Sequence, residues 1–342
     1  MLAYLLLITF VLFFAHIGKK HLLGRVLAFL IVALFVGLRK DVGTDYESYV
    51  DIYNLDYFYL EPGFNFIIIL FNNWNLNESW MFMFFAILTY TFYFFTVETN
   101  RDIKNKYPLV LMFSLLTVSV TCNGIRQALA AAIFFFSYKF MKEKKCIPFI
   151  GLIVIAFMFH KSILFVIPFY FADKIRLNKQ LYVLIYVFSF IFTSLDLAEI
   201  ATPLQFLIKD NTRYMNLVEE NYGQSYLSLG IIVEILSYAI ILIVALHNNM
   251  HKNNPMLFNL LFALCVLMNM RVGASLMSRM MMYFVGFFYI SIPYVGNEIK
   301  NPKFRRQFYA LYIAWFIISN IKYIYWDKVS RMFPYHDVFD IF

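Results

Sequence analysis

Apolar runs that approach or reach the length of a bilayer crossing recur along this chain, and they limit its fold more than any other feature. Examples are the stretches 22–38, 78–97 and 124–141. A bilayer core is about 30 Å thick, which a helix of about 20 apolar residues spans. The chain is 62% hydrophobic and only 15% charged, so a soluble globule could not bury its apolar surface. The sequence therefore predicts an all-α, polytopic integral membrane protein.

We expect about twelve transmembrane helices in a single membrane domain, residues 1–342. Span 162–172 is too short for an α-helical crossing and indicates half of a broken helix. The short apolar stretch 63–71, which begins at Pro62-Gly63, indicates a re-entrant or interfacial piece. The predicted spans are residues 2–17, 22–38, 78–97, 107–122, 124–141, 146–160, 162–172, 181–195, 227–247, 256–272, 280–296 and 308–325.

The basic residues indicate the orientation of these spans. One alternating set of loops holds 18 of the 29 Lys and Arg residues, which places these loops in the cytoplasm and both termini outside. The outer face then carries segments at about 39–77 and 196–226 and a tail at 326–342. This asymmetry explains the formal charge of +8, so no nucleic-acid partner is expected. The basic residues are Lys19, Lys20, Arg25, Arg101, Lys104, Lys106, Lys139, Lys142, Lys144, Lys145, Lys174, Arg176, Lys179, Lys252, Lys300, Lys303, Arg305 and Arg306.

A dense polar cluster, GLRKDVGTDYESY at residues 37–49, directly follows an apolar span. Thr44 and Glu47 fit a capping box, which predicts a helix that starts at Asp45. Asp45 and Glu47 either complement the dipole of that helix or belong to a site. Arg39 lies at the outer end of a span, where basic residues are disfavoured, so it either snorkels or binds an anion.

A second cluster, NGIRQALAAAI at residues 123–133, places Arg126 and Gln127 in the first turn of a span. A cation at a helix N-terminus is unfavourable for the helix dipole, so an anion is expected nearby. That anion is either a structural partner such as Asp45 or a bound group. The alanines that follow permit close helix packing.

Two further polar features interrupt apolar sequence. His160 and Lys161 lie at a turn between two hydrophobic arms, where His160 is either packed in the core or part of a site. Arg271 and Arg279 bracket a predicted outer turn between two later spans.

The four arginines at residues 39, 126, 271 and 279 are expected to project toward one outer vestibule. Arginine keeps its charge at any pH and binds phosphate oxygens in pairs, so this set indicates a diphosphate site. The sequence has no P-loop, HExxH or GxSxG motif. Asp45 and Glu47 form only a weak pair of metal ligands, so we expect neither cofactor nor metal.

These stretches, with FHKSILFVIPFY at 159–170, SRMMMYF at 278–284 and FPY at 333–335, resemble the EpsG family of polysaccharide polymerases, which is related to Wzy-type O-antigen and capsule polymerases. The R-x-x-x-G-T-D-Y core of the first stretch is the most specific part. The resemblance covers nearly the entire chain. It implies a GT-C-like membrane glycosyltransferase at the outer face of a bacterial cytoplasmic membrane, which transfers a growing glycan from a polyprenyl diphosphate carrier to a lipid-linked repeat unit.

The predicted site fits that reaction, because fixed arginines stabilise the charge that grows on the departing diphosphate. The acceptor hydroxyl needs a base, and His160 is preferred to Asp45, whose charged form a helix N-terminus stabilises. We predict Asp45, Arg126 and His160 as catalytic residues. The predicted substrate-binding residues are Arg39, Tyr49, Arg126, Gln127, Arg271 and Arg279.

The expected partners are the polyprenyl-diphosphate-linked oligosaccharide, membrane lipids, and a chain-length regulator and a flippase of the same pathway. Three other functions stay open. A flippase or transporter would also bind diphosphate but predicts paired repeats and broken helices near the midplane. A ligase that moves finished glycan to another acceptor needs a very similar site. A membrane O-acyltransferase would open its histidine pocket to a cytoplasmic donor.

Overall fold

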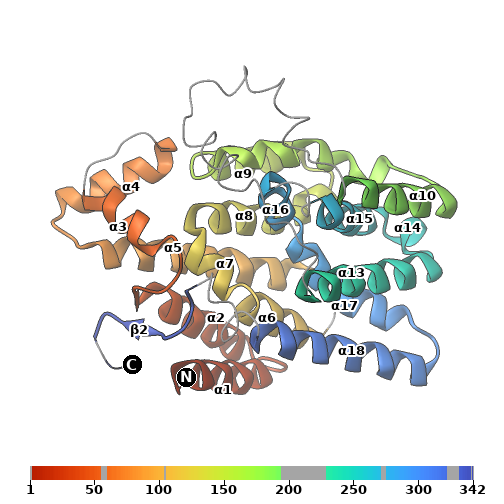
Figure 1. Ribbon diagram of the computed structural model, residues 1–342, viewed down its shortest axis with the longest axis horizontal. Coiled ribbons are helices and arrows are strands. Elements are labelled where there is room, and N and C mark those ends of the chain that lie inside the picture. Colours follow the sequence, from red (N-terminus) through yellow and green to blue (C-terminus); the bar gives the residue numbers. More distant parts are fainter. Residues whose placement is uncertain are drawn as a thin grey trace. The chain divides into compact units, whose positions relative to one another are not determined.

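The computed structural model describes residues 2–54, 60–103, 105–193, 229–270, 275–321, 331–339 and 341. These residues are predominantly helical, which confirms the all-α prediction (Figure 1). The chain forms two compact units. The first contains Met1–Tyr170 and Lys300–Phe342, and the second contains Phe171–Ile299.

The first unit is built around α5 and α8, which pack against each other. Helix α2 packs on α5, α1 packs on α2, and α9 packs on α8. Four alanines of α8, at positions 128 and 130–132, are buried, and their small side chains let the neighbouring helices approach closely. The elements are α1 (Leu2–Ile17), α2 (Leu22–Gly37), β1 (Arg39–Lys40), α3 (Tyr46–Asn54), α4 (Pro62–Asn73), α5 (Glu78–Thr99), α6 (Tyr107–Leu115), α7 (Val118–Asn123), α8 (Ile125–Lys142), α9 (Cys146–Phe157), η1 (Lys161–Lys174), α18 (Pro302–Ile321) and β2 (His336–Asp337).

The second unit is organised around α15, which packs on α10, α13 and α17. The hydroxyl of Tyr182 in α10 donates to Asn259 Oδ1 in α15 over 2.7 Å. Asn259 Nδ2 donates in turn to the carbonyls of Ala172 and Ile175, so one buried amide ties the beginning of this unit to α15. The elements are α10 (Lys179–Ser189), η2 (Phe190–Thr193), α13 (Leu229–His247), α14 (Met250–Asn253), α15 (Pro255–Met270), α16 (Ser275–Met282) and α17 (Val285–Glu298).

The segment predicted as half of a broken helix is a 14-residue 3₁₀ helix, η1. A 3₁₀ helix rises about 2.0 Å per residue, so η1 extends about 28 Å, close to the thickness of a bilayer core. An α-helix of the same length would extend only about 21 Å. The predicted short piece at 63–71 is the twelve-residue helix α4.

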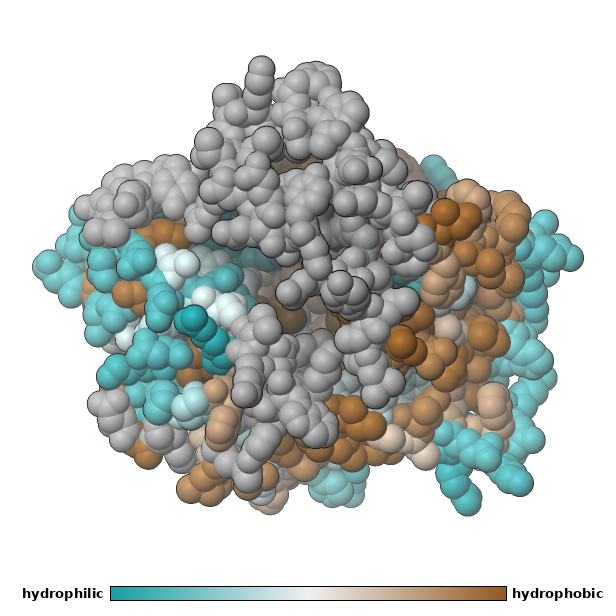
Figure 2. Space-filling view, viewed as in Figure 1, coloured by the Kyte–Doolittle hydropathy of each residue, from teal (hydrophilic) through white to brown (hydrophobic). Residues whose placement is uncertain are grey.

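Within the described residues, only α5 is both long enough and apolar enough to cross a bilayer by itself. Other apolar helices, among them α1, α2, α9 and α15, have between 10 and 17 residues. Many large apolar side chains of α1 and α18 are exposed. Figure 2 shows brown surface along the lower edge, where these two helices lie, and teal surface where α18 begins. The count of twelve spans and the GT-C-like architecture stay predictions.

The C-terminal residues 331–337 contact the segment that includes the end of α2 and β1. Strand β2 pairs antiparallel with β1, and Asp337 lies opposite Arg39. The hydroxyl of Tyr335 donates to the Phe35 carbonyl over 2.7 Å, and the two rings stack 4.0 Å apart. Gly43 N–H donates to the Arg331 carbonyl over 3.0 Å. Residues 326–330, 340 and 342 of the predicted external tail lie outside the described residues, as does the whole predicted outer segment 196–226.

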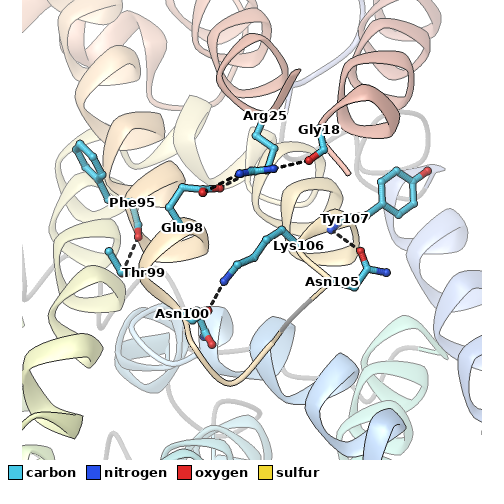
Figure 3. A network of polar contacts seen from close by, with 9 residues as sticks. All are labelled: Gly18, Arg25, Phe95, Glu98, Thr99, Asn100, Asn105, Lys106 and Tyr107. Carbon is cyan, nitrogen blue, oxygen red and sulfur yellow. Dashed lines mark hydrogen bonds and ion pairs between the residues drawn. The ribbon is translucent and has the colours of Figure 1, made fainter. Parts of the chain in front are cut away.

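A polar network fixes the end of α5 (Figure 3). Arg25 of α2 donates from Nε and Nη2 to the two carboxylate oxygens of Glu98, over 2.6 and 3.0 Å, and from Nη1 to the Gly18 carbonyl. Lys106 donates to the Asn100 carbonyl just beyond the helix end, and burial lowers the pKa of this lysine. The bonds of Arg25 therefore tie together two loops that the sequence assigns to the cytoplasmic side.

Candidate functional site

An ion pair between Arg126 and Glu61 is the centre of the candidate site. Arg126 is the second residue of α8, and Glu61 is the residue before α4. Arg126 Nη1 donates to Glu61 Oε2, and both side chains are largely buried. The other carboxylate oxygen accepts from the backbone N–H of Lys161 over 3.2 Å. One carboxylate thus joins the start of α8 to the turn that follows α9.

The sequence Glu-Pro-Gly explains how Glu61 reaches this position. Pro62 occupies the first position of α4, where its fixed φ suits a helix start. Gly63 N–H donates to the Met158 carbonyl over 2.8 Å. A Cβ atom on Gly63 would lie 2.8 Å from both that carbonyl oxygen and Met158 Cβ, so only glycine permits this close approach.

Aromatic rings enclose the Arg126 guanidinium. Its central carbon lies 5.3 Å from the centre of the Phe64 ring and 5.9 Å from that of the Tyr49 ring, both buried. Such positions add cation–π attraction in a dry surrounding. Arg126 Nε is buried without a hydrogen-bond partner in the described part of the chain. A buried unsatisfied donor costs about 1–3 kcal/mol, so this atom is suited to an acceptor brought by a ligand.

His160 lies in the turn that supports Glu61. Its backbone N–H donates to the Ala156 carbonyl at the end of α9, and its Nδ1 lies 2.7 Å from Ser162 Oγ. The N–H that reaches Glu61 belongs to the next residue, Lys161. His160 is therefore adjacent in sequence to the residue whose N–H contacts the Glu61 carboxylate.

Arg39 occupies a different kind of environment. It is fully buried, with an exposed fraction of 0%. Its Nε, Nη1 and Nη2 donate to the carbonyls of Val42, Val36 and Cys122 over 3.1, 2.6 and 2.9 Å. Its guanidinium carbon lies 4.5 Å from the centre of the Phe82 ring. These contacts clamp the end of α2 to the following turn and to α7. They do not favour the diphosphate role, which stays a prediction.

The expected capping box at Thr44 is wrong. Helix α3 begins at Tyr46, one residue later than predicted. Asn123 Oδ1 accepts from both the Thr44 N–H and the Thr44 hydroxyl, over 2.6 and 2.9 Å, because the end of α7 supplies a tertiary partner for this turn. Glu47 is exposed and lies 3.5 Å from Arg331 Nη1.

The remaining predicted residues are distributed over the molecule. Asp45 is exposed, and Gln127 is buried next to Arg126 in α8. Arg279 is partly exposed in α16 of the second unit, and Arg271 lies outside the described residues. The first unit brings Arg126, Tyr49 and the His160 turn together, whereas their convergence with Arg271 and Arg279 stays a prediction.

Glu61 is the functional candidate that the sequence reading missed. The sequence predicts an anion near Arg126, either a structural partner such as Asp45 or a bound group. The available signal was an acidic residue placed directly before Pro-Gly at the start of an apolar stretch. Among the described residues, no group of three or more His, Cys, Asp and Glu side chains could hold a metal ion. The absence of a metal from the reaction stays a prediction.

Comparison with known proteins identifies one family. The model of the EpsG family matches residues 22–336, which is nearly the whole chain. The same comparison finds no curated protein and no solved structure that matches this chain. The match includes every residue of the cluster around Arg126.

Proposed function

We propose, from the premise that this chain belongs to the EpsG family, that it polymerises polyprenyl-diphosphate-linked oligosaccharide repeat units at the outer face of a bacterial cytoplasmic membrane. Family membership supports a membrane protein with a polymerase role in exopolysaccharide synthesis. The proposal adds to this a lipid-linked donor, a reaction at the outer face and roles for individual residues. Its product is a surface polysaccharide such as an exopolysaccharide, a capsule or an O-antigen.

The buried pair of Arg126 and Glu61 carries the proposal. A membrane protein keeps an ionisable pair in an apolar surrounding at a high cost in desolvation, and such residues commonly mark a substrate site. Arg126 has an unpartnered buried Nε and a guanidinium that can meet two phosphate oxygens. Glu61 supplies a carboxylate, and His160 supplies an imidazole in the turn whose Lys161 N–H donates to that carboxylate.

The reaction assigned to these groups is a displacement at the anomeric carbon. The diphosphate of the donor takes Arg126 as its partner, which releases Glu61 from the ion pair. The freed carboxylate removes the proton from the acceptor hydroxyl as the acceptor oxygen bonds to the anomeric carbon. The bond from that carbon to the diphosphate oxygen breaks, and the electron pair leaves with the carrier diphosphate. Arg126 stabilises the charge that develops there. His160 is the alternative base.

The orientation can be tested separately from the chemistry. The basic loops place residues 98–106, 142–145 and 298–306 inside and both termini outside. A single cysteine introduced at position 143 of an otherwise cysteine-free chain should stay unlabelled when intact cells meet an impermeant thiol reagent. Labelling of that cysteine from outside would contradict the orientation.

Reconstitution tests the proposed reaction. Purified chain in proteoliposomes should lengthen a lipid-linked repeat unit into polymer without a nucleotide sugar, and excess chelator should not prevent it. Gel analysis of the lipid-linked products measures the chain length. A transporter would move the substrate without lengthening it, and a ligase would transfer finished glycan to a second acceptor. Either result would contradict the polymerase proposal.

A further inference from the structure

A polar cavity of about 190 Å³ lies where α5 and α8 end. It is far from the candidate site, because Arg126 and Lys142 are separated along α8 by 16 residues, or about 24 Å of helix rise. A single buried water needs only a small part of this volume, so a larger polar group fits. Nothing in the proposed reaction uses this end of the unit.

The acidic side chains of the cavity already have cationic partners. Asp102 forms an ion pair with Lys142 and accepts from the Tyr138 hydroxyl over 3.2 Å. Glu143 Oε2 lies 2.8 Å from Lys145 Nζ, and this contact holds the pKa of Glu143 below its usual range. Neither acid therefore needs a further cation.

Two basic side chains of the cavity, Arg101 and Lys139, form no close ion pair within the described part of the chain. Both act on Glu143 only at longer range, where they help to lower its pKa. Helix C-termini favour nearby cations, which accounts for basic residues at the ends of α5 and α8. Arg101 and Lys139, which come from the ends of two different helices, can therefore bind an anion in the cavity.

Asn100 also lines the cavity. Its exposed fraction is 6%, and its Nδ2 is buried without a hydrogen-bond partner. The orientation of this amide is fixed, because Oδ1 accepts from the Asp102 N–H over 3.0 Å. Lys106 holds the Asn100 carbonyl on the other side (Figure 3). The unpartnered N–H groups therefore call for a hydrogen-bond acceptor.

We propose that this cavity binds a phosphate group, and that its source is the headgroup of an anionic phospholipid in the cytoplasmic leaflet. The guanidinium of Arg101 can meet two phosphate oxygens, while Lys139 and the Asn100 amide contribute single donors. Basic residues beside membrane helices attract anionic lipids at that surface. The choice of leaflet rests on the orientation given under the proposed function, whereas the phosphate chemistry does not.

Lipid titration of the purified full-length chain in neutral detergent tests this site. Phosphatidylglycerol should raise the melting temperature of the wild type more than phosphatidylcholine does. The double variant Arg101→Gln/Lys139→Gln should need about 10-fold or more phosphatidylglycerol for the same shift, as expected when charge-assisted hydrogen bonds are lost. The matched control Lys303→Gln/Arg306→Gln removes two exposed charges assigned to the same side and should respond like the wild type.

Two further arms complete the experiment. Asn100→Asp keeps the oxygen that faces the Asp102 N–H but replaces the free donor, so it should weaken the lipid response. Soluble glycerol 3-phosphate that reproduces or competes with that response would support a phosphate site with a soluble source. Equal responses to both lipids with none to glycerol phosphate, or equal loss in the control variant, would overturn the proposal. The readout needs no catalysis, so failed polymerisation leaves it unaffected, and Arg126→Lys should bind the lipid normally.

Discussion

Two arginines of the first unit, the fully buried Arg39 and the largely buried Arg126, lie beside the ends of apolar helices but contact different partners. Arg39 gives all three guanidinium nitrogens to backbone carbonyls. Arg126 faces the carboxylate of Glu61 and keeps a buried Nε without a partner. Both lie against aromatic rings.

The two arginines differ in whether a substrate could replace their present hydrogen-bond acceptors. Backbone carbonyls cannot leave without unfolding the segments they belong to, so the contacts of Arg39 stabilise the fold. A carboxylate can release a guanidinium and then act as a base, so the contacts of Arg126 can be replaced by a substrate. Burial and charge alone do not separate the two cases, whereas the identity of the acceptors does.

The largest effect is expected for Glu61→Gln. Glutamine keeps the size of the side chain and an acceptor for the Lys161 N–H, but it cannot remove a proton. Polymerisation by reconstituted protein should fall about 10²- to 10⁴-fold, the range for loss of a general base. The control Glu47→Gln changes an exposed carboxylate and should leave the rate near wild type. Normal polymer from Glu61→Gln would return the role of base to His160 or Asp45.

Arg126→Lys should have the next largest effect. Lysine keeps the charge but loses the planar pair of donors that meets two phosphate oxygens. Loss of one charge-assisted contact of about 2–3 kcal/mol corresponds to roughly a 30- to 150-fold lower rate. The measurement is the chain-length distribution at matched membrane abundance. Unchanged polymer would mean that Arg126 serves only the ion pair.

Arg39→Lys should lower stability rather than turnover. One ammonium group cannot reach three carbonyls from the Arg39 position, and buried carbonyls would lose their donors. The free energy of unfolding should fall by about 2–4 kcal/mol. Thermal unfolding in detergent measures this, and turnover per folded molecule should stay near wild type. A stable variant with lost turnover would restore Arg39 to the substrate site.

Tyr335→Phe should have the smallest effect. It removes the hydrogen bond to the Phe35 carbonyl but keeps the stacked rings. A loss of about 1 kcal/mol is expected, seen as faster proteolysis of the tail. The exposed residue Phe339 offers a control, because Phe339→Leu should be nearly neutral. Equal proteolysis of the wild type and Tyr335→Phe would mean that the hydrogen bond does not hold the tail.

The sequence predicted the helices well, because apolar runs report burial or lipid contact wherever they occur. The predicted spans 2–17 and 78–97 correspond to α1 and α5 within two residues at each end. Backbone type was harder to predict. No residue pattern in FHKSILFVIPFY predicts a 3₁₀ helix. The predicted span 107–122 is divided into α6 and α7 by a break at 116–117, where the sequence has neither glycine nor proline.

The site was predicted only in part, because partners distant in sequence decide what a polar side chain does. The need for an anion beside Arg126 followed from helix electrostatics, but the choice of Glu61 over Asp45 depends on how α4 packs on the turn after α9. Similarly, Thr44 matched a capping motif until Asn123 supplied a tertiary acceptor. The partners of Arg39 are backbone carbonyls, which every residue carries, so the sequence cannot identify them.

Equilibrium binding of polyprenyl diphosphate to purified wild type, Arg126→Lys and Arg39→Lys tests the distinction between the two arginines most directly. Thermal unfolding of the same samples gives their stability. We expect Arg126→Lys to bind about 10-fold or more weakly with an unchanged melting temperature. Arg39→Lys should bind like the wild type but melt earlier. Equally weakened binding in both variants, or wild-type affinity in Arg126→Lys, would contradict the assignment of Arg126 to the substrate and Arg39 to the fold.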